Sequence, residues 1–251
     1  NESLEDARYV ASLCNDLGVP LTSQKEDVQG HRARRRISLE EAARECRYAF
    51  FGAAAKKLDA QTVLLAHTGD DQAETILMHI LRGTGVQGLK GMKAMTMVWL
   101  SSPGDVALGR PLLGMTRSDT EGYCGVMGLR SREDSSNRSK EHLRNRLRLE
   151  VMPFLRKVNP RVGEALLRLG ANAQALESFL DTEVSQWWPK VVTRHEGGFS
   201  VDRSVAAKLP ESLMTHLLRR VLGEFRGDLK GIRSENIHDI AKLALGPTGK
   251  S

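Results

Sequence analysis

The most restrictive feature of this sequence is a short apolar run followed at once by a turn and an acidic helix. The run TVLLA, residues 62–66, is uninterrupted, which is typical of a strand buried on both faces. Residues 67–69 turn the chain, and a helical pattern then runs from Asp70 to about Arg82. Strand, tight turn and helix in this order form half of a β-α-β unit. The sequence therefore predicts an α/β fold with a parallel sheet.

Three acidic side chains stand at the start of that helix. Asp70, Asp71 and Glu74 lie just past the carboxyl end of the predicted strand, where open α/β sheets bind their ligands. Asp71 and Glu74 are three residues apart, so both face the same way on a helix. Two such carboxylates can hold a lysine ammonium group, or a Mg²⁺ ion that bridges to phosphates. Taken alone, they are more simply an N-cap and charges that complement the helix dipole.

Basic residues stand out in three segments. HRARRR covers residues 31–36, and Ser38 with Glu41 three residues later then predicts the capped start of a helix. In that helix the segment EEAARECRYAFF, 40–51, places Arg44 and Arg47 on one face, where they are solvated or paired with Glu40 and Glu41 unless they bind a ligand. Residues 135–160 carry seven basic residues against two acids. These basic residues are Arg138, Lys140, Arg144, Arg146, Arg148, Arg156 and Lys157. A helix this basic indicates phosphate contacts, and a solvated face explains it equally well. The net charge of +6 agrees with a nucleic-acid partner without requiring one.

The chain divides near Pro160, where Asn-Pro interrupts the helical pattern. Before this point, strand and helix patterns alternate, and beyond it the chain is mainly helical with one hairpin-like segment around Gly197. The later helical stretches are 161–188, 211–223 and 234–245. We expect an α/β domain at 1–158 and, at 159–251, a mainly helical domain that begins with a long linking helix.

Composition and spacing exclude several classes of protein. No run of about eighteen apolar residues exists, so we expect no membrane span. Cys14, Cys46 and Cys124 form no CxxC pair, which favours a reduced, cytoplasmic protein over a disulfide or zinc framework. The terminal GPTGKS is similar to a Walker A loop, but Ala244 stands where that pattern needs glycine. We therefore predict no P-loop at this end.

Four segments in this order resemble the tRNA(Ile)-lysidine synthetases, a family of PP-loop ATPases. They are SLEEAARECRYAFF, AHTGDDQAETILMHILRGTGVQGLKGM, RPLL and DSSN…LRNRLRLEVMPFLRKVNP. The ordered match covers about residues 6–160, with weaker similarity beyond. The resemblance implies an adenine-nucleotide α-hydrolase-like parallel sheet. It also implies a ligase that uses ATP to adenylate the oxygen on carbon 2 of the wobble cytidine of tRNA(Ile), after which the amine of free lysine displaces AMP to form lysidine.

The resemblance implies that Asp71 and Glu74 are catalytic acids that seat the lysine ammonium group. It also gives Asp70 and Asp71 a share in binding Mg²⁺. The expected cofactors are ATP and Mg²⁺. The expected partners are a tRNA(Ile) with a CAU anticodon and free L-lysine, with no membrane partner. A second copy of the chain, forming a homodimer, is a further possible partner.

Basic residues take the remaining roles that the resemblance implies. Arg47 would act in catalysis by meeting the phosphates or the activated base. His67 and Arg146 would be further contacts to ATP. The expected tRNA contacts are Arg138, Arg144, Arg146 and Arg148.

The sequence departs from the family pattern in two respects. Thr68 and Gly69 replace the histidine and alanine of the commonest turn, AHHADDQAET. The SGGxDS loop, which cradles pyrophosphate in this family, occurs nowhere in these residues. We therefore expect a fragment of a longer protein that is inactive alone. Two alternatives stay open: a non-catalytic tRNA-binding remnant, and another PP-loop tRNA enzyme such as a 2-thiocytidine synthetase, although the paired cysteines typical of the latter are missing.

Overall fold

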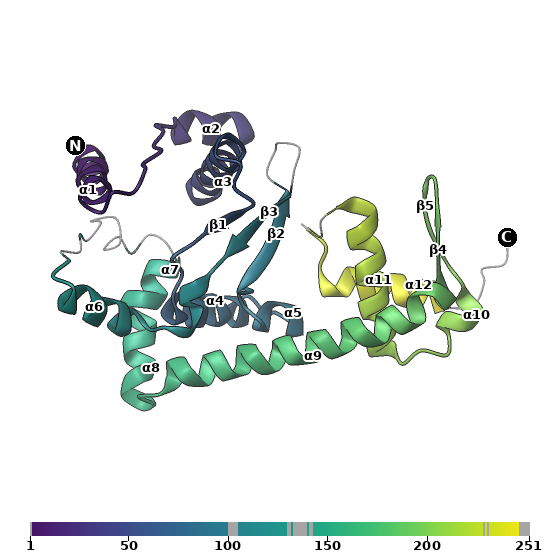
Figure 1. The fold of residues 1–251 in the computed structure, drawn as a ribbon. Coiled ribbons are helices and arrows are strands. Elements are labelled where there is room, and N and C mark those ends of the chain that lie inside the picture. Colours follow the sequence, from purple (N-terminus) through teal and green to yellow (C-terminus); the bar gives the residue numbers. More distant parts are fainter. Residues whose placement is uncertain are drawn as a thin grey trace. The chain divides into compact units, whose positions relative to one another are not determined.

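A computed structural model of the chain is drawn in Figure 1. It describes residues 2–99, 105–129, 132, 140, 143–227, 229 and 231–245. The chain forms two compact units, Asn1–Thr75 with Met92–Gly163, and Ile76–Gly91 with Glu164–Ser251. Within the described ranges, none of the helices combines the length and the apolar character that a membrane crossing requires.

The first unit contains a mixed sheet. Its described strands are β1 (Thr62–Leu64), β2 (Met95–Trp99) and β3 (Asp105–Gly109), in the order β1-β3-β2. β1 runs parallel to β3, whereas β2 and β3 form an antiparallel pair. The predicted α/β class is confirmed, and the predicted parallel pairing holds for β1 and β3 only.

Helices make up most of the rest of the first unit. Ser38 caps α3, because its hydroxyl oxygen accepts from the Glu41 N–H at 3.2 Å, which confirms the cap expected from the sequence pattern. The basic run 31–36 lies largely within a helix of its own, α2, which packs against α3 (Figure 1). The helices of this unit are α1 (Glu2–Asp16), α2 (Val28–Arg35), α3 (Leu39–Lys57), the start of α4 (Gly69–Leu81), the 3-10 helix η1 (Pro111–Gly114), α6 (Arg117–Val126), α7 (Leu143–Arg146), the π-helix η3 (Leu147–Val151) and α8 (Met152–Val158).

The prediction that residues 62–66 are buried on both faces is wrong. Thr62 and Leu64 are exposed, whereas Val63 packs with Tyr48 and Phe51 of α3. β1 lies at one edge of the described sheet, and its side chains alternate between a covered and an exposed face. An uninterrupted apolar run shows that its residues are hydrophobic. It does not show whether other elements cover one face of the strand or both.

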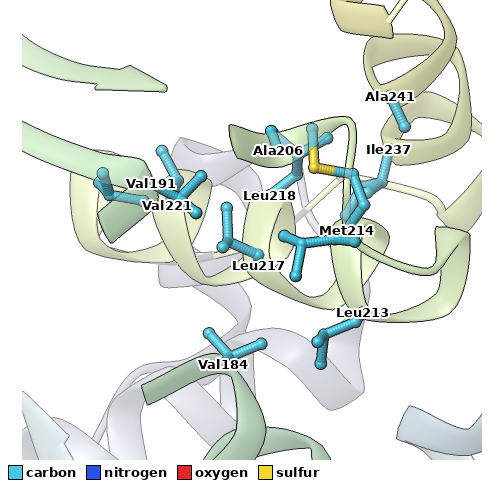
Figure 2. Packing of buried hydrophobic residues seen from close by; sticks show 12 residues of the cluster. Val184, Val191, Ala206, Leu213, Met214, Leu217, Leu218, Val221, Ile237 and Ala241 are labelled. Carbon is cyan, nitrogen blue, oxygen red and sulfur yellow. The ribbon is translucent and has the colours of Figure 1, made fainter. Parts of the chain in front are cut away.

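The second unit is mainly helical. Its elements are the end of α4, α5 (Val86–Leu89), the long α9 (Val162–Val191), the hairpin of β4 (Val192–His195) and β5 (Gly198–Val201), α10 (Arg203–Ala206), α11 (Glu211–Arg226) and α12 (Ser234–Leu245). Its core lies along one stripe of α11 (Figure 2). Met214 and Leu217 on that stripe are fully buried, and Val184 of α9 and Ile237 of α12 belong to the same cluster. The 3.6-residue period of α11 therefore determines which of its side chains hold this unit together.

Candidate functional site

Hydrogen bonds donated by the backbone N–H groups of Thr68 and Gly69 fix the turn between β1 and α4. The Gly69 N–H donates to the carbonyl oxygen of Met115 at 2.7 Å. Asp71 Oδ2 accepts from the backbone N–H of Thr68 at 2.9 Å and from the Thr68 hydroxyl at 3.1 Å. Such a bond from the first helical turn back to the preceding residue satisfies an N–H group that the helix leaves unpaired. Thr68, which departs from the family pattern, is thus a double donor to Asp71.

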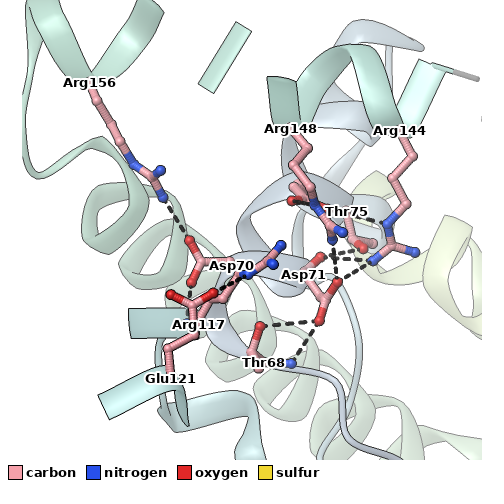
Figure 3. A network of polar contacts seen from close by, with 10 residues as sticks. Thr68, Asp70, Asp71, Thr75, Arg117, Glu121, Arg144, Arg148 and Arg156 are labelled. Atoms are coloured by element: carbon pink, nitrogen blue, oxygen red, sulfur yellow. Dashed lines mark hydrogen bonds and ion pairs between the residues drawn. The ribbon is translucent and has the colours of Figure 1, made fainter. Parts of the chain in front are cut away.

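Two arginines bind the predicted acid pair (Figure 3). Arg148 donates from Nε to Glu74 Oε1 at 2.7 Å, and from Nη2 to Glu74 Oε2 and Asp71 Oδ1, both at 2.9 Å. Arg144 donates from Nε to Glu74 Oε2 at 3.3 Å and from Nη2 to Asp71 Oδ1 at 3.2 Å. These four side chains, which we call the acid–arginine cluster, carry two positive and two negative charges.

Burial makes the charges of the cluster interact strongly. The Glu74 side chain is only 4% exposed, whereas the side chains of Arg144 and Arg148 are 34% and 26% exposed. The hydrogen bond to Glu74 is the main cause that raises the pKa of Arg148 above its ordinary value. Burial acts to raise the pKa of Asp71, but the Thr68 N–H and the two arginines outweigh it and hold that pKa below its ordinary value. Both shifts favour the charged forms of Asp71 and Arg148.

A π-helical turn shapes the backbone that carries these arginines. The segment from Leu143 to Val158 continues from α7 through the π-helix η3 into α8, and the π-turn lies directly after Arg146. Pro153 follows at the start of α8, and a proline lacks the N–H that an α-helix would use there. A single widened turn of this kind is frequent at functional sites.

Asp70 binds a different pair of donors. Its Oδ1 accepts from Arg156 Nη2 at 2.7 Å, and its Oδ2 accepts from the backbone N–H of Arg117 at 2.7 Å (Figure 3). The guanidinium group of Arg117 binds Glu121 at 2.8 Å. Asp70 therefore joins α4 to α6 and α8.

These side chains surround a hollow of about 320 Å³. It is lined by Thr68, Asp70, Asp71, Glu74, Arg117, Arg148, Met152 and Arg156. The lining includes three carboxylates and three arginines, so it offers partners to both cationic and anionic groups of a ligand. Its residues begin just past the carboxyl end of β1, where ligands bind in α/β sheets.

The residues here do not form a ready seat for the predicted Mg²⁺ ion. Both oxygens of Asp70 and both oxygens of Asp71 already accept from nitrogen or hydroxyl donors. In the part of the chain that the structure describes, no group of three or more histidine, cysteine, aspartate or glutamate side chains is arranged to hold a metal ion. Magnesium prefers several oxygen ligands at once, so these residues as arranged do not fit it by themselves.

His67 lies in the turn that leads into α4. Its Nδ1 is buried and makes no hydrogen bond with any described residue. Burial is the main cause that lowers its pKa, Asp71 opposes the shift, and the nearby arginines 110, 144 and 47 lower it further. The imidazole is therefore neutral at neutral pH and keeps one ring nitrogen for a partner.

The other predicted site residues lie apart from the cluster. Arg146 is 60% exposed and reaches only Glu150, at 3.8 Å, four residues along its own helix segment. Arg47 is exposed on α3, close enough to His67 to influence its pKa. Arg138 lies outside the described residues. Of the four predicted tRNA contacts, Arg144 and Arg148 are thus directed to carboxylates.

Comparison with known proteins adds to this geometry. A family model described as a PP-loop domain matches residues 1–155, which is more than half of the chain. The chain belongs to the PP-loop domain family. The acid–arginine cluster and its hollow both lie within the first unit of this PP-loop protein.

Curated relatives carry the family name that the motifs indicated. The chain is 38% identical over 249 residues to a tRNA(Ile)-lysidine synthase of Dehalococcoides mccartyi, covering 99% of this chain and 53% of that protein. It is 36% identical over 251 residues to one of Geobacter sulfurreducens, covering 98% and 51%, and 35% identical over 222 residues to one of Bacillus cereus, covering 88% and 44%. The resemblance is therefore confirmed, and the chain spans about half the length of these relatives.

Sequence reasoning missed several residues of this PP-loop site. Thr68, Arg117 and Arg156 line the hollow, and none of them was expected there. The sequence did indicate a charged contact for Arg156, because it belongs to the basic segment 135–160. It did not indicate the partner, because Asp70 lies 86 residues away. Arg117 acts through its backbone N–H, which no side-chain pattern indicates.

Proposed function

We propose that this chain is part of an enzyme that joins lysine to carbon 2 of the wobble cytidine of a tRNA(Ile) with a CAU anticodon. ATP adenylates the oxygen on carbon 2 and pyrophosphate leaves. The side-chain amine of lysine then attacks carbon 2 and AMP leaves. The names of the relatives support this reaction, and the PP-loop family supports the use of ATP.

The observation that carries the proposal is the binding of two guanidinium groups by one acid pair. Asp71 and Glu74 accept N–H donors from Arg144 and Arg148 in a region where Glu74 is almost fully buried. A site that holds cationic nitrogen donors in this way has the charge and acceptors that a lysine ammonium group needs. We therefore keep Asp71 and Glu74 as the proposed catalytic and lysine-binding acids.

Lysine binding at this pair requires an exchange of partners. Removing one partner from a buried ion pair costs about 3–5 kcal/mol, because the other charge is left uncompensated. The arginines are the more exposed partners, so they are the groups that would move when an ammonium group arrives. Once released, Arg144 and Arg148 would be free to bind phosphates of tRNA, which is the role proposed for them from the sequence.

The other proposed roles follow the family resemblance. Arg47, His67 and Arg146 would contact ATP, with Arg47 acting in catalysis, and Arg138 and Arg146 would contact tRNA. Mg²⁺ enters the proposal as the ion that accompanies ATP, and the share of Asp70 and Asp71 in binding it rests on the family resemblance alone. Residues 1–158 would carry the chemistry and residues 159–251 would bind tRNA. The reaction would take place in the cytoplasm, as expected for a tRNA substrate, and a homodimer remains a prediction.

Glu74→Gln tests the proposal in the natural gene product that contains this chain. Glutamine keeps the shape of glutamate but loses its charge, so the ammonium group loses a charge-assisted bond worth about 1.5–3 kcal/mol, or about tenfold or more in affinity. We expect lysine incorporation to require at least about tenfold more lysine. Pyrophosphate release that depends on tRNA should persist.

Glu177→Gln is the matched control. Glu177 is also buried and also binds a basic side chain, Lys90, but it lies in the second unit. If both variants lose lysine incorporation equally, the effect is general destabilisation and the role of Glu74 is refuted. If the wild-type protein binds tRNA but neither releases pyrophosphate nor incorporates lysine, the non-catalytic tRNA-binding alternative replaces the proposal.

A further inference from the structure

Helix α2 carries the run HRARRR, which has no role in the site described above. His31, Arg32, Arg34 and Arg35 lie within α2, and Arg36 is its C-cap. Arg36 adopts the left-handed conformation, with φ 54° and ψ 43°, and so ends the helix. α2 itself contains no acidic residue.

Two of these basic side chains hold α2 against α3. His31 Nε2 lies 2.7 Å from Glu45 Oε2, and Arg35 Nε lies 3.5 Å from the same oxygen. The hydrogen bond from His31 is the main cause that lowers the pKa of Glu45. One acid thus serves two basic residues, and it is the acid through which α3 binds α2.

Three arginines remain outside this contact. Arg32, Arg34 and Arg36 are exposed, and none of them forms an ion pair with any residue in the described ranges. Arg32 and Arg36 are four residues apart and line a hollow of about 410 Å³. The hollow is lined by Gln29, Arg32, Ala33, Arg36 and Ile37. We call Gln29, Arg32 and Arg36 the α2 basic surface; Arg34 is two residues from each of these arginines and so faces another side of the helix.

The helix dipole explains only part of this charge. A helix C-terminus carries about half a negative elementary charge, which one basic residue is enough to complement. Arg32 and Arg36 give the α2 basic surface two positive charges, and neither forms an ion pair with an acid in the described residues. Clustered arginines without acids raise the local concentration of anions and can each bind a phosphate through two parallel N–H donors.

We propose that the α2 basic surface binds the sugar–phosphate backbone of RNA. Arg32, Arg36 and Gln29 line the hollow together with Ala33 and Ile37, so three of its five residues can donate hydrogen bonds to a phosphate and its ribose. The surface lies on α2, whereas the acid–arginine cluster lies on α4 and on the segment 143–151. The proposal rests on the proposed function only in the choice of tRNA as the probe.

The test is the salt dependence of tRNA binding by the double variant Arg32→Gln, Arg36→Gln. Each phosphate contact contributes about 0.7–0.9 to the slope of log affinity against log salt concentration. Loss of two contacts should therefore lower the slope by about 1.4–1.8. Between about 50 and 200 mM salt, wild-type affinity should then fall about 7- to 12-fold more than the affinity of the variant.

A second double variant removes the same charge elsewhere in the first unit. Lys56→Gln, Lys57→Gln changes two exposed basic residues outside the α2 basic surface, and we expect its slope to stay near that of the wild type. An equal drop in both variants means a general charge effect and overturns the proposal, and so do equal slopes in the wild type and the Arg32/Arg36 variant. If that variant loses binding of inorganic phosphate or of an acidic peptide but keeps the tRNA slope, the surface binds that anion and the proposal is also overturned. Lysidine formation is not part of this measurement, so its failure would leave the result unaffected.

Discussion

Arg148 binds Glu74 through two parallel hydrogen bonds, from Nε to Oε1 at 2.7 Å and from Nη2 to Oε2 at 2.9 Å. The two residues are 74 positions apart in the chain, and the pair joins α4 to the π-helix η3. Guanidinium and carboxylate are both planar, so this paired arrangement fixes orientation as well as distance. The pair is therefore both a structural contact of the first unit and the centre of the proposed lysine site.

Arg148→Gln should destabilise the first unit. The change leaves the buried Glu74 with only Arg144 as a cationic partner, and we expect a loss of about 2–4 kcal/mol in the free energy of unfolding. Arg146→Gln is the matched control on the same segment, because Arg146 is mostly exposed and its pair with Glu150 lies on the surface, where such pairs contribute little to stability. Urea unfolding of both variants measures the difference. Equal losses would mean that the Arg148–Glu74 pair contributes no more than a surface pair.

Asp71 should make stability depend on pH in the acid range. Its pKa in the folded protein lies below the ordinary value of 3.8, so folding favours the ionised form. The resulting stability is fully present above the unfolded pKa and is lost as pH falls through the folded pKa, which places the loss below about pH 4. Asp71→Asn should therefore show a shallower fall in unfolding free energy below that pH. Wild type and variant curves that stay parallel in acid would contradict the shift.

His67 should titrate at a lower pH than an ordinary histidine. Burial lowers its pKa from 6.5, so the neutral imidazole is favoured in the folded state. Its contribution to stability is present above pH 6.5 and is lost as pH falls through the folded pKa. The ring-proton signals in an NMR titration, assigned with a His67→Gln variant, give the midpoint directly. A midpoint at or above 6.5 would refute the effect of burial.

Leu217→Ala should destabilise the second unit strongly. Leu217 is fully buried on the apolar stripe of α11, and removal of a buried leucine side chain costs about 2–5 kcal/mol. Leu243→Ala on α12 is the control, because that leucine is largely exposed and should change stability by about 0.5 kcal/mol or less. Denaturant unfolding followed by circular dichroism compares the two. Similar effects at both positions would mean that α11 does not pack as Figure 2 shows.

The sequence alone determined the features that depend on neighbouring residues. Ser38 and Glu41 predicted the start of α3, and the periodic apolar pattern predicted α9, α11 and α12. The spacing of Asp71 and Glu74 predicted that both face one way from the start of α4, and the ordered motifs indicated the family. These features follow from residues within a few positions of one another, where backbone geometry relates spacing to direction.

Only the tertiary structure decided which charges meet. The basic segment 143–151 was expected to face phosphates, yet Arg144 and Arg148 bind the acids of α4 and Arg146 points to Glu150. The apolar run at 62–66 was expected to be covered on both faces, yet Leu64 is exposed at the edge of the sheet. The charge and hydrophobicity of a segment indicate what kind of group it favours as a partner. They do not indicate which residue of the chain that partner is. The partner depends on how elements more than 70 residues apart pack, and local patterns carry no information about that packing.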